Sequence, residues 1–171
     1  MFRSITILVL TTILISVAMP SAEAAVQVGT GAHYWTTLDS IDLDHVDDDG
    51  FAYYLSVLFF PEYLLRVQVD VERMEAGYRG AKDDVYAPSA YVVLGKSLYA
   101  AVGMGCYLSD FRFHEDEFYA LRIGFEVSLF PNVYLDLNAN YRFDDWGDDD
   151  PVLEDIDTDT VTLGGAIRVE F

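Results

Sequence analysis

The residues with the clearest chemical potential in this sequence are carboxylates gathered in two acidic runs, at residues 39–50 and 144–159. Calcium prefers hard oxygen ligands, and aspartates at alternate positions match the ligand spacing of a calcium loop. An EF-hand would also need a turn glycine and a bidentate glutamate at position twelve, and neither occurs in that frame. The sequence thus leaves two interpretations, a calcium site or a hydrated acidic surface. The candidate ligands are Asp47, Asp48, Asp49, Asp155, Asp157 and Asp159.

The overall charge narrows the possible partners. The chain carries a formal net charge of −19 at pH 7. A surface this negative repels phosphate groups, so nucleic acid is not an expected partner. Calcium at the acidic runs is the one cofactor that the sequence suggests.

A second group of charged residues, of both signs, occurs at alternate positions of otherwise apolar segments. If each segment is a strand, these residues share one face and form a charge network inside a narrow barrel. Counting from the predicted turns places them at three heights. Unpaired ions in a dry interior would cost several kcal/mol each, so paired networks are expected. The lowest group is Arg66, Glu126, Asp136 and Arg168, the next is Asp70 and Arg122, the highest is Glu72 and Arg142, and Glu170 joins the same face.

The elements that must position these residues are strands with a two-residue period. The last segment shows the pattern: Leu163, Ile167 and Phe171 lie on one face, and Thr162 and Arg168 on the other. Each such segment has about the length of a tilted strand that crosses a bilayer. The predicted strands are residues 26–35, 51–60, 63–74, 86–94, 98–108, 118–130, 133–143 and 160–171.

Two kinds of connection alternate between these segments. Residues 60–62, 95–97 and 130–132 contain Pro or Gly and are predicted to be tight turns. Residues 39–50, 76–85, 109–117 and 144–159 are predicted to be long polar loops. An even number of strands with this alternation closes into an antiparallel barrel without a free edge.

Aromatic residues support a membrane barrel over a soluble one. They gather at both ends of the predicted strands, with the parity of the aliphatic face, as interfacial aromatic belts do. A lipocalin-like barrel would instead turn its apolar face inward, but charges of both signs on the other face fit a narrow interior better than a solvated exterior. The outward aromatics are Tyr34, Phe51, Tyr53, Tyr86, Tyr119, Tyr141 and Phe143 at the loop side, and Phe59, Tyr63 and Phe171 at the turn side.

The N-terminus has the pattern of a secretory signal. A short basic start is followed by an apolar stretch and by Ala22-Glu-Ala24, a small-x-small cleavage site. We therefore expect a signal peptide at residues 1–24 and one barrel domain at residues 25–171.

The terminal strand, which ends in Ile167-Arg-Val-Glu-Phe171, and the turn and loop alternation resemble the small eight-stranded outer-membrane barrels of the OmpX type and the transmembrane domain of OmpA. This resemblance implies an all-β, up-and-down transmembrane barrel in a bacterial outer membrane. It also implies that Phe171 is the signal read by the barrel-assembly machinery, and that lipid and lipopolysaccharide (LPS) surround the chain.

Three functions fit such a barrel. The sequence favours a non-catalytic protein that presents acidic extracellular loops to cations, to LPS or to an external partner that the sequence does not identify. The second is a narrow gated pore for ions or very small solutes, with Asp70 and Arg122 at its gate.

The third is a lipid A-modifying enzyme, since some barrels of similar shape have this activity. The deacylase type uses a His-x-Ser pattern, and none of His33, His45 and His114 stands in one. A site that joins His45 or His114 to Ser109 stays open, because catalytic triads are defined by geometry.

Overall fold

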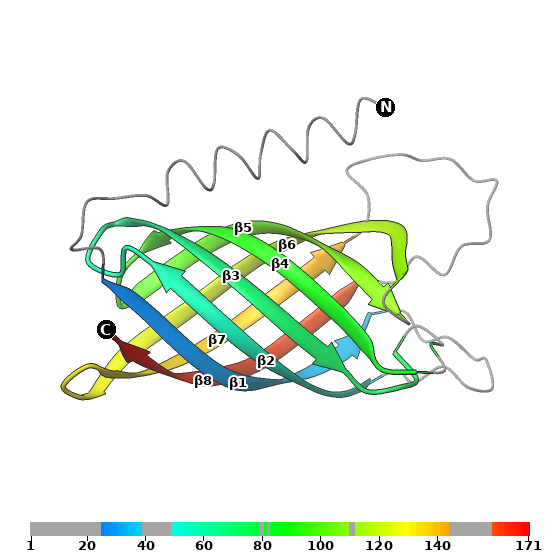
Figure 1. The fold of residues 1–171 in the computed structure, drawn as a ribbon, viewed down its shortest axis with the longest axis horizontal. Coiled ribbons are helices and arrows are strands. Elements are labelled where there is room, and N and C mark those ends of the chain that lie inside the picture. The colour runs from blue at the N-terminus through cyan, green and yellow to red at the C-terminus, as the bar shows by residue number, and fades with distance from the viewer. Residues whose placement is uncertain (1–24, 39–48, 79–80, 82, 110–111, 144–158) are drawn as a thin grey trace, which may run out of the picture.

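The computed structural model describes residues 25–38, 49–78, 81, 83–109, 112–143 and 159–171. Eight antiparallel strands follow one another around a closed barrel in chain order (Figure 1). The predicted fold class is confirmed. The strands are β1 (Val26–Thr37), β2 (Asp49–Phe59), β3 (Leu65–Met74), β4 (Val85–Gly95), β5 (Leu98–Ser109), β6 (Arg112–Phe130), β7 (Val133–Phe143) and β8 (Thr160–Glu170).

The barrel closes where the last strand meets the first. β8 pairs with β1 from Gln27↔Glu170 to Thr37↔Thr160. The backbone N–H of Phe171 donates to the carbonyl of Val26 at 2.9 Å, which extends this seam to the final residue. No sheet edge is therefore left open along the seam.

Alternation along each strand separates an apolar outside from a polar inside. Arg122 is 2% exposed, whereas its neighbour Ile123 is 65% exposed. Leu163 in β8 is likewise exposed, and Thr162 beside it is buried. The outward position of the apolar face contradicts a lipocalin-like barrel. Of the aromatics predicted to face outward, Tyr34, Phe51, Tyr53, Tyr63, Tyr86 and Phe171 are exposed.

The three predicted tight turns lie at one end of the barrel, which we call the turn end. Each contains a residue with positive φ: Phe60 (61°), Gly95 (121°) and Asn132 (62°). A side chain at position 95 would also meet the backbone oxygen of Leu98, so glycine is required there. The opposite end, where the longer connections join the strands, is called the loop end.

The prediction that residues 109–117 form a long loop is wrong. β6 already begins at Arg112, and its first residues pair with β5 through Ser109↔Arg112 and Leu108↔Phe113. A register shift follows between Cys106 and Leu108. The segment was missed because it carries mostly charged residues and so lacks the apolar alternate face by which the other strands are recognised.

The ends of the other strands differ from the predicted ends by only one or two residues. β1 runs two residues further than predicted, to Thr37, and β2 begins at Asp49 rather than at residue 51. β3 begins at Leu65, because Tyr63 belongs to the preceding turn, where its N–H donates to the carbonyl of Phe60 at 3.0 Å. The described residues contain no helix long and apolar enough to span a membrane. The predicted signal peptide, residues 1–24, lies outside them.

Candidate functional site: a charged interior under an acidic rim

Four arginines and four carboxylates point into the barrel from β3, β6, β7 and β8. The side chain of Glu126, the most accessible of them, is 10% exposed, and the other side chains are at most 3% exposed. Strand alternation places them there, since each lies at an inward position, and the outward neighbours are apolar except for Arg73 beside Glu72. Their formal charges cancel, as expected for ions held in a low-dielectric interior. The eight are Arg66, Asp70, Glu72, Arg122, Glu126, Asp136, Arg142 and Arg168.

The layer nearest the turn end brings together the four residues that were predicted at the lowest height. Arg168 forms ion pairs with Asp136 and, at 3.3 Å, with Glu126. Arg66 lies 3.6 Å from Glu126, and it also donates to the backbone carbonyl of Lys96 at 3.2 Å. Glu126 thus bridges two arginines that would otherwise repel each other.

The middle layer contains the Asp70–Arg122 pair. The guanidinium Nη2 of Arg122 lies 2.8 Å from the Asp70 carboxylate, and its Cζ lies 3.9 Å from the centroid of the Tyr91 ring. Gln68 donates to Asp70 at 2.8 Å and accepts from Arg168 at 3.0 Å. This amide joins the middle layer to the turn-end layer.

The layer nearest the loop end is built around Glu72. Its carboxylate pairs with Arg142 through one oxygen, and its other oxygen lies 2.7 Å from Nδ1 of His33. His33 is 1% exposed. Its ring also stacks on Tyr54, with centroids 4.2 Å apart.

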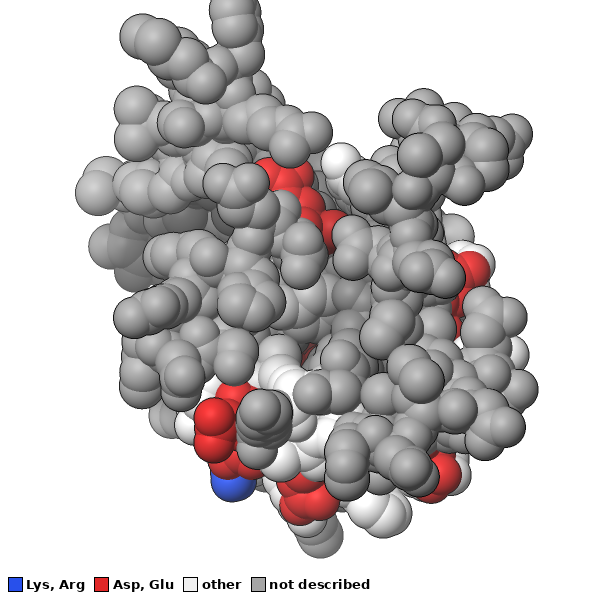
Figure 2. Space-filling view, turned by 90° about the vertical axis from the view of Figure 1, so that its right-hand side faces the viewer, with Lys and Arg blue, Asp and Glu red and all other residues white. Residues whose placement is uncertain are grey.

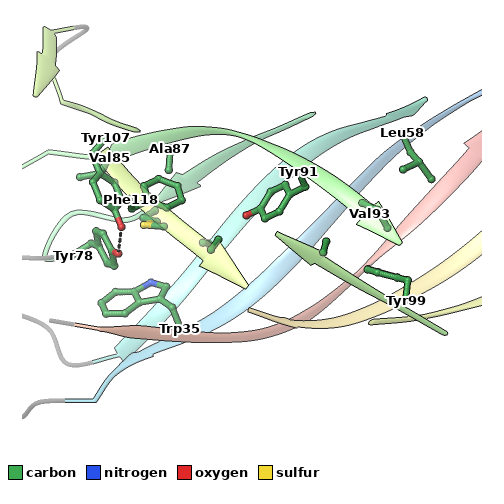
Figure 3. Packing of buried hydrophobic residues seen from close by; sticks show 14 residues of the cluster. Trp35, Leu58, Tyr78, Val85, Ala87, Tyr91, Val93, Tyr99, Tyr107 and Phe118 are labelled. Carbon is green, nitrogen blue, oxygen red and sulfur yellow. Dashed lines mark hydrogen bonds between the residues drawn. The ribbon is translucent and has the colours of Figure 1, made fainter. Parts of the chain in front are cut away.

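Aromatic rings pack against one another inside the loop end of the barrel (Figure 3). The indole of Trp35 meets the ring of Tyr78 edge-on at 4.8 Å, and the Tyr78 hydroxyl lies 3.0 Å from that of Tyr107. Phe118 packs on Tyr107 at 4.8 Å and lies under the Arg142 guanidinium. Strand periodicity does not predict this cluster, because Tyr78 lies between strands, in a segment predicted to be a polar loop.

Tyr99 is a second interior residue that was not among the predicted site residues. Its hydroxyl donates to the Asp136 carboxylate at 2.7 Å. The ring can lie there because Gly124 faces it, and a Cβ at Gly124 would collide with the ring and its hydroxyl. On the inward face of β5, Tyr99 and Tyr107 flank three small residues, and Tyr99 pairs with Gly124 of β6. A large ring opposite a glycine was the signal available in the sequence.

Replacing Tyr99 with phenylalanine is therefore expected to destabilise the barrel by about 1.5–3 kcal/mol, the usual value for a hydrogen bond to a charged group. Urea unfolding of the refolded chain measures the loss. The matched control is Tyr34→Phe, which removes an exposed hydroxyl that donates to Asp49 at 2.7 Å and should cost much less. Equal losses in the two variants would contradict the assignment of a buried, strong bond to Tyr99.

The predicted calcium ligands are only partly described. Asp49 accepts the hydrogen bond from Tyr34, and Asp159 accepts one from the Tyr141 hydroxyl. Asp47, Asp48, Asp155 and Asp157 lie outside the described residues. Within the described part of the chain, no three His, Cys, Asp or Glu side chains are placed to hold a metal ion. The calcium site thus stays a prediction.

Acidic side chains nevertheless surround the loop end (Figure 2). One of these acidic residues, Asp84, forms an ion pair with Arg73 at 2.6 Å. The acidic residues of this rim, which we call the acidic rim, are Asp49, Glu75, Asp83, Asp84, Glu117 and Asp159.

The remaining predicted site residues lie at the turn end, or their side chains lie outside the described part of the structure. Glu170 accepts a hydrogen bond from Gln27 at 2.9 Å, and Phe171 exposes 79% of its surface. His45 and the side chains of Ser109 and His114 lie outside what the structure describes, so the catalytic site considered for them is not tested.

Comparison with known proteins gives likenesses in structure only, since the chain matches no protein-family model and no curated protein. It is similar to the crystal structure of Neisserial surface protein A, with a TM-score of 0.54 and 18% identity over 86% of this chain and 97% of the other. It is also similar to the outer membrane protein OprG from Pseudomonas aeruginosa, with a TM-score of 0.51 and 13% identity over 85% and 95% of the two chains.

These likenesses, the closed eight-stranded topology and the apolar exterior define the class. The chain has the fold of the small eight-stranded outer-membrane β-barrels. At such low identities the likeness concerns the fold, and the function has to be argued from the residues.

Proposed function

We propose that this protein is a non-catalytic barrel of a bacterial outer membrane whose loop end faces outward and contacts cations and LPS. The membrane assignment rests on the polarity of the barrel wall, in which apolar side chains face outward and charged ones inward. Arg122, for example, is buried, whereas its neighbour Ile123 is exposed. Apolar side chains all around a barrel suit a hydrocarbon solvent, and aromatic side chains at both ends suit its interfaces.

The orientation follows from the connections. In barrels of this kind the short turns are periplasmic and the longer loops are extracellular. Both ends of the described barrel, Val26 and Phe171, lie at the turn end (Figure 1). Phe171 would then be available to the assembly machinery from the periplasmic side.

The acidic rim supports the second half of the proposal. LPS carries phosphate groups, which divalent cations can bridge to carboxylates, since both are hard oxygen ligands. Direct contact without a cation would be repulsive. The proposed contact therefore depends on calcium or magnesium.

The test is binding of purified LPS to the refolded chain in detergent, with calcium or with a chelator. We expect binding only with the cation, and a large loss when the six candidate aspartates at positions 47, 48, 49, 155, 157 and 159 are changed to asparagine. Glu62→Gln, at the turn end, is the control and should bind like the parent chain. If LPS binding is unchanged both by the chelator and by the six substitutions, the proposed cation bridge is refuted.

A narrow pore is the second candidate, and the polar chain from Glu126 through Arg168, Gln68 and Asp70 to Arg122 favours it. Conduction would require the Asp70–Arg122 pair to separate. Eight strands leave an interior that side chains can fill, so passage of large solutes is not part of this candidate.

A further inference from the structure

We propose that the barrel interior binds a small anion of the chloride type between Arg122, Arg142 and the hydroxyl of Tyr91. The inference goes beyond the proposed function and does not depend on what the loops bind. It rests on polar groups that are buried in the barrel and have no partner among the described residues. Buried polar groups in proteins are nearly always hydrogen-bonded, so such groups indicate a bound ion or water.

Two arginines supply unpaired donors. Arg142 pairs with Glu72 through Nη2, and its Nε and Nη1 have no partner. Arg122 contacts Asp70 through Nη2 and Asn140 through Nε, and its Nη1 has no partner. Both side chains are buried, so bulk water does not reach these nitrogens. Because an arginine side chain can only donate, the group that completes them must be an acceptor.

The third unpaired group is the hydroxyl of Tyr91 on β4. Among the described tyrosines of the interior, Tyr91 is the only one whose hydroxyl has no hydrogen-bond partner. Figure 3 shows this hydroxyl pointing towards the loop end of the barrel. The ring lies close against β5, since a Cβ at Gly103 would collide with it. The hydroxyl is therefore held at one place in the interior.

The three groups converge between the middle layer and the loop-end layer. The Cζ of Arg122 lies 3.9 Å from the centroid of the Tyr91 ring. The Tyr91 hydroxyl interacts electrostatically with both guanidinium groups. Arg142 pairs with Ala120, two residues from Arg122 on the same inward face of β6. Donors from β4, β6 and β7 thus face one region of the interior.

The chemistry of these groups favours an anion over water. A buried water needs acceptors for its own hydrogens as well as donors for its oxygen. The nearby carboxylates of Asp70 and Glu72 are already engaged in ion pairs, and the unpaired groups are donors apart from the Tyr91 oxygen. An anion accepts from all of these donors, and such charge-assisted hydrogen bonds are stronger than neutral ones.

The turn-end layer has unpaired arginine nitrogens too, but it suits an anion less. Nη1 of Arg66 lies 3.6 Å from Glu126, and Nη1 of Arg168 lies 3.3 Å from the same carboxylate. That carboxylate would repel an anion. The guanidinium of Arg142, in contrast, lies over the apolar ring of Phe118, with its Cζ 5.0 Å from the ring centroid.

The direct experiment is crystallography of the refolded full barrel with sodium bromide in place of sodium chloride. We expect an anomalous bromine peak inside the barrel, in contact with the Tyr91 hydroxyl and the Arg142 guanidinium. An interior without a bromine signal would overturn the proposal.

Two tyrosine variants test the site in solution. Tyr91→Phe removes the unpaired hydroxyl, and Tyr99→Phe removes the hydroxyl that donates to Asp136. Urea midpoints are compared in sodium chloride and in sodium gluconate at equal ionic strength, since gluconate is too large for an eight-stranded interior filled with side chains. We expect Tyr91→Phe to lower the midpoint in chloride but not in gluconate. Tyr99→Phe should lower it equally in both salts.

The direction of the Tyr91→Phe effect separates a bound anion from an empty site. Removing a buried hydroxyl that has no partner removes a desolvation cost, so at an empty site the midpoint would rise or stay unchanged in both salts. That result, or an equal loss in both salts, would contradict the proposal.

The parent chain gives a last check. A ligand of the folded state stabilises it more as its concentration rises. The urea midpoint of the parent chain should therefore increase with chloride at constant ionic strength. If it does not change, any bromide peak reflects binding at crystal concentration only, and the proposal fails.

Discussion

Replacing Arg122 with methionine is expected to destabilise the folded barrel by about 3–5 kcal/mol, the usual loss when one partner of a buried ion pair is removed. Asp70 would keep its hydrogen bond from Gln68, but its charge would stay buried without the guanidinium. Asn140 would lose its donor and Tyr91 the cation above its ring. Urea unfolding of the refolded chain, followed by heat-modifiable gel mobility, measures the change.

A double-mutant cycle separates the ion pair from the packing. Because removing both charges leaves no uncompensated ion, Arg122→Met combined with Asp70→Asn should recover much of the loss. If the two single losses simply add, Asp70 and Arg122 are not energetically coupled, and the middle layer is not held together as described.

Replacing Leu163 with arginine is expected to lower the free energy of unfolding by about 2–4 kcal/mol, the usual cost of an arginine on the lipid face near the middle of the bilayer. Leu163 lies on the outward face of β8 and is 57% exposed, so an aqueous exterior would tolerate the charge almost without cost. The same unfolding assay in lipid vesicles gives the number.

The control for this prediction is Tyr63→Arg, since Tyr63 is equally outward but lies in a turn at the barrel end. Charges at the interface cost about 0–1 kcal/mol on this scale. Equal losses at the two positions would mean that the outer surface does not follow a membrane depth profile. The inward Thr162, next to Leu163, is fully buried, so an arginine at that position tests the packing of the interior instead.

The barrel itself could be predicted because its wall obeys a simple solvent rule. Every outward position must suit one apolar medium, so residues such as Ile123 and Leu163 alternate with polar ones along each strand. This alternation is not required of strand residues that lie beyond the apolar band. The beginning of β6 at Arg112 was therefore not predicted. No apolar face is required of residues 112–117, so the pattern used to find strands is absent.

The interior could be predicted in part. Counting from the turns placed Asp70 beside Arg122 and Glu72 beside Arg142, because strand pairing keeps residues at equal distances from the turns close in height. Tyr78 lies outside the strands and could not be placed in this way. Asn138 and Asn140 share the inward face of β7 with Asp136 and Arg142, but their hydrogen-bond partners depend on the shape of the interior, which sequence periodicity does not contain.

Single-channel conductance of the refolded mature chain in a planar bilayer tests most directly whether this barrel is a closed structure that works through its outer rim. With the interior filled by paired charges and capped by Trp35 and Tyr78, we predict a silent membrane, with the chain shown to be folded by its gel mobility. Reproducible openings that change when Arg122 or Asp70 is neutralised would contradict the proposal and make the protein a gated pore.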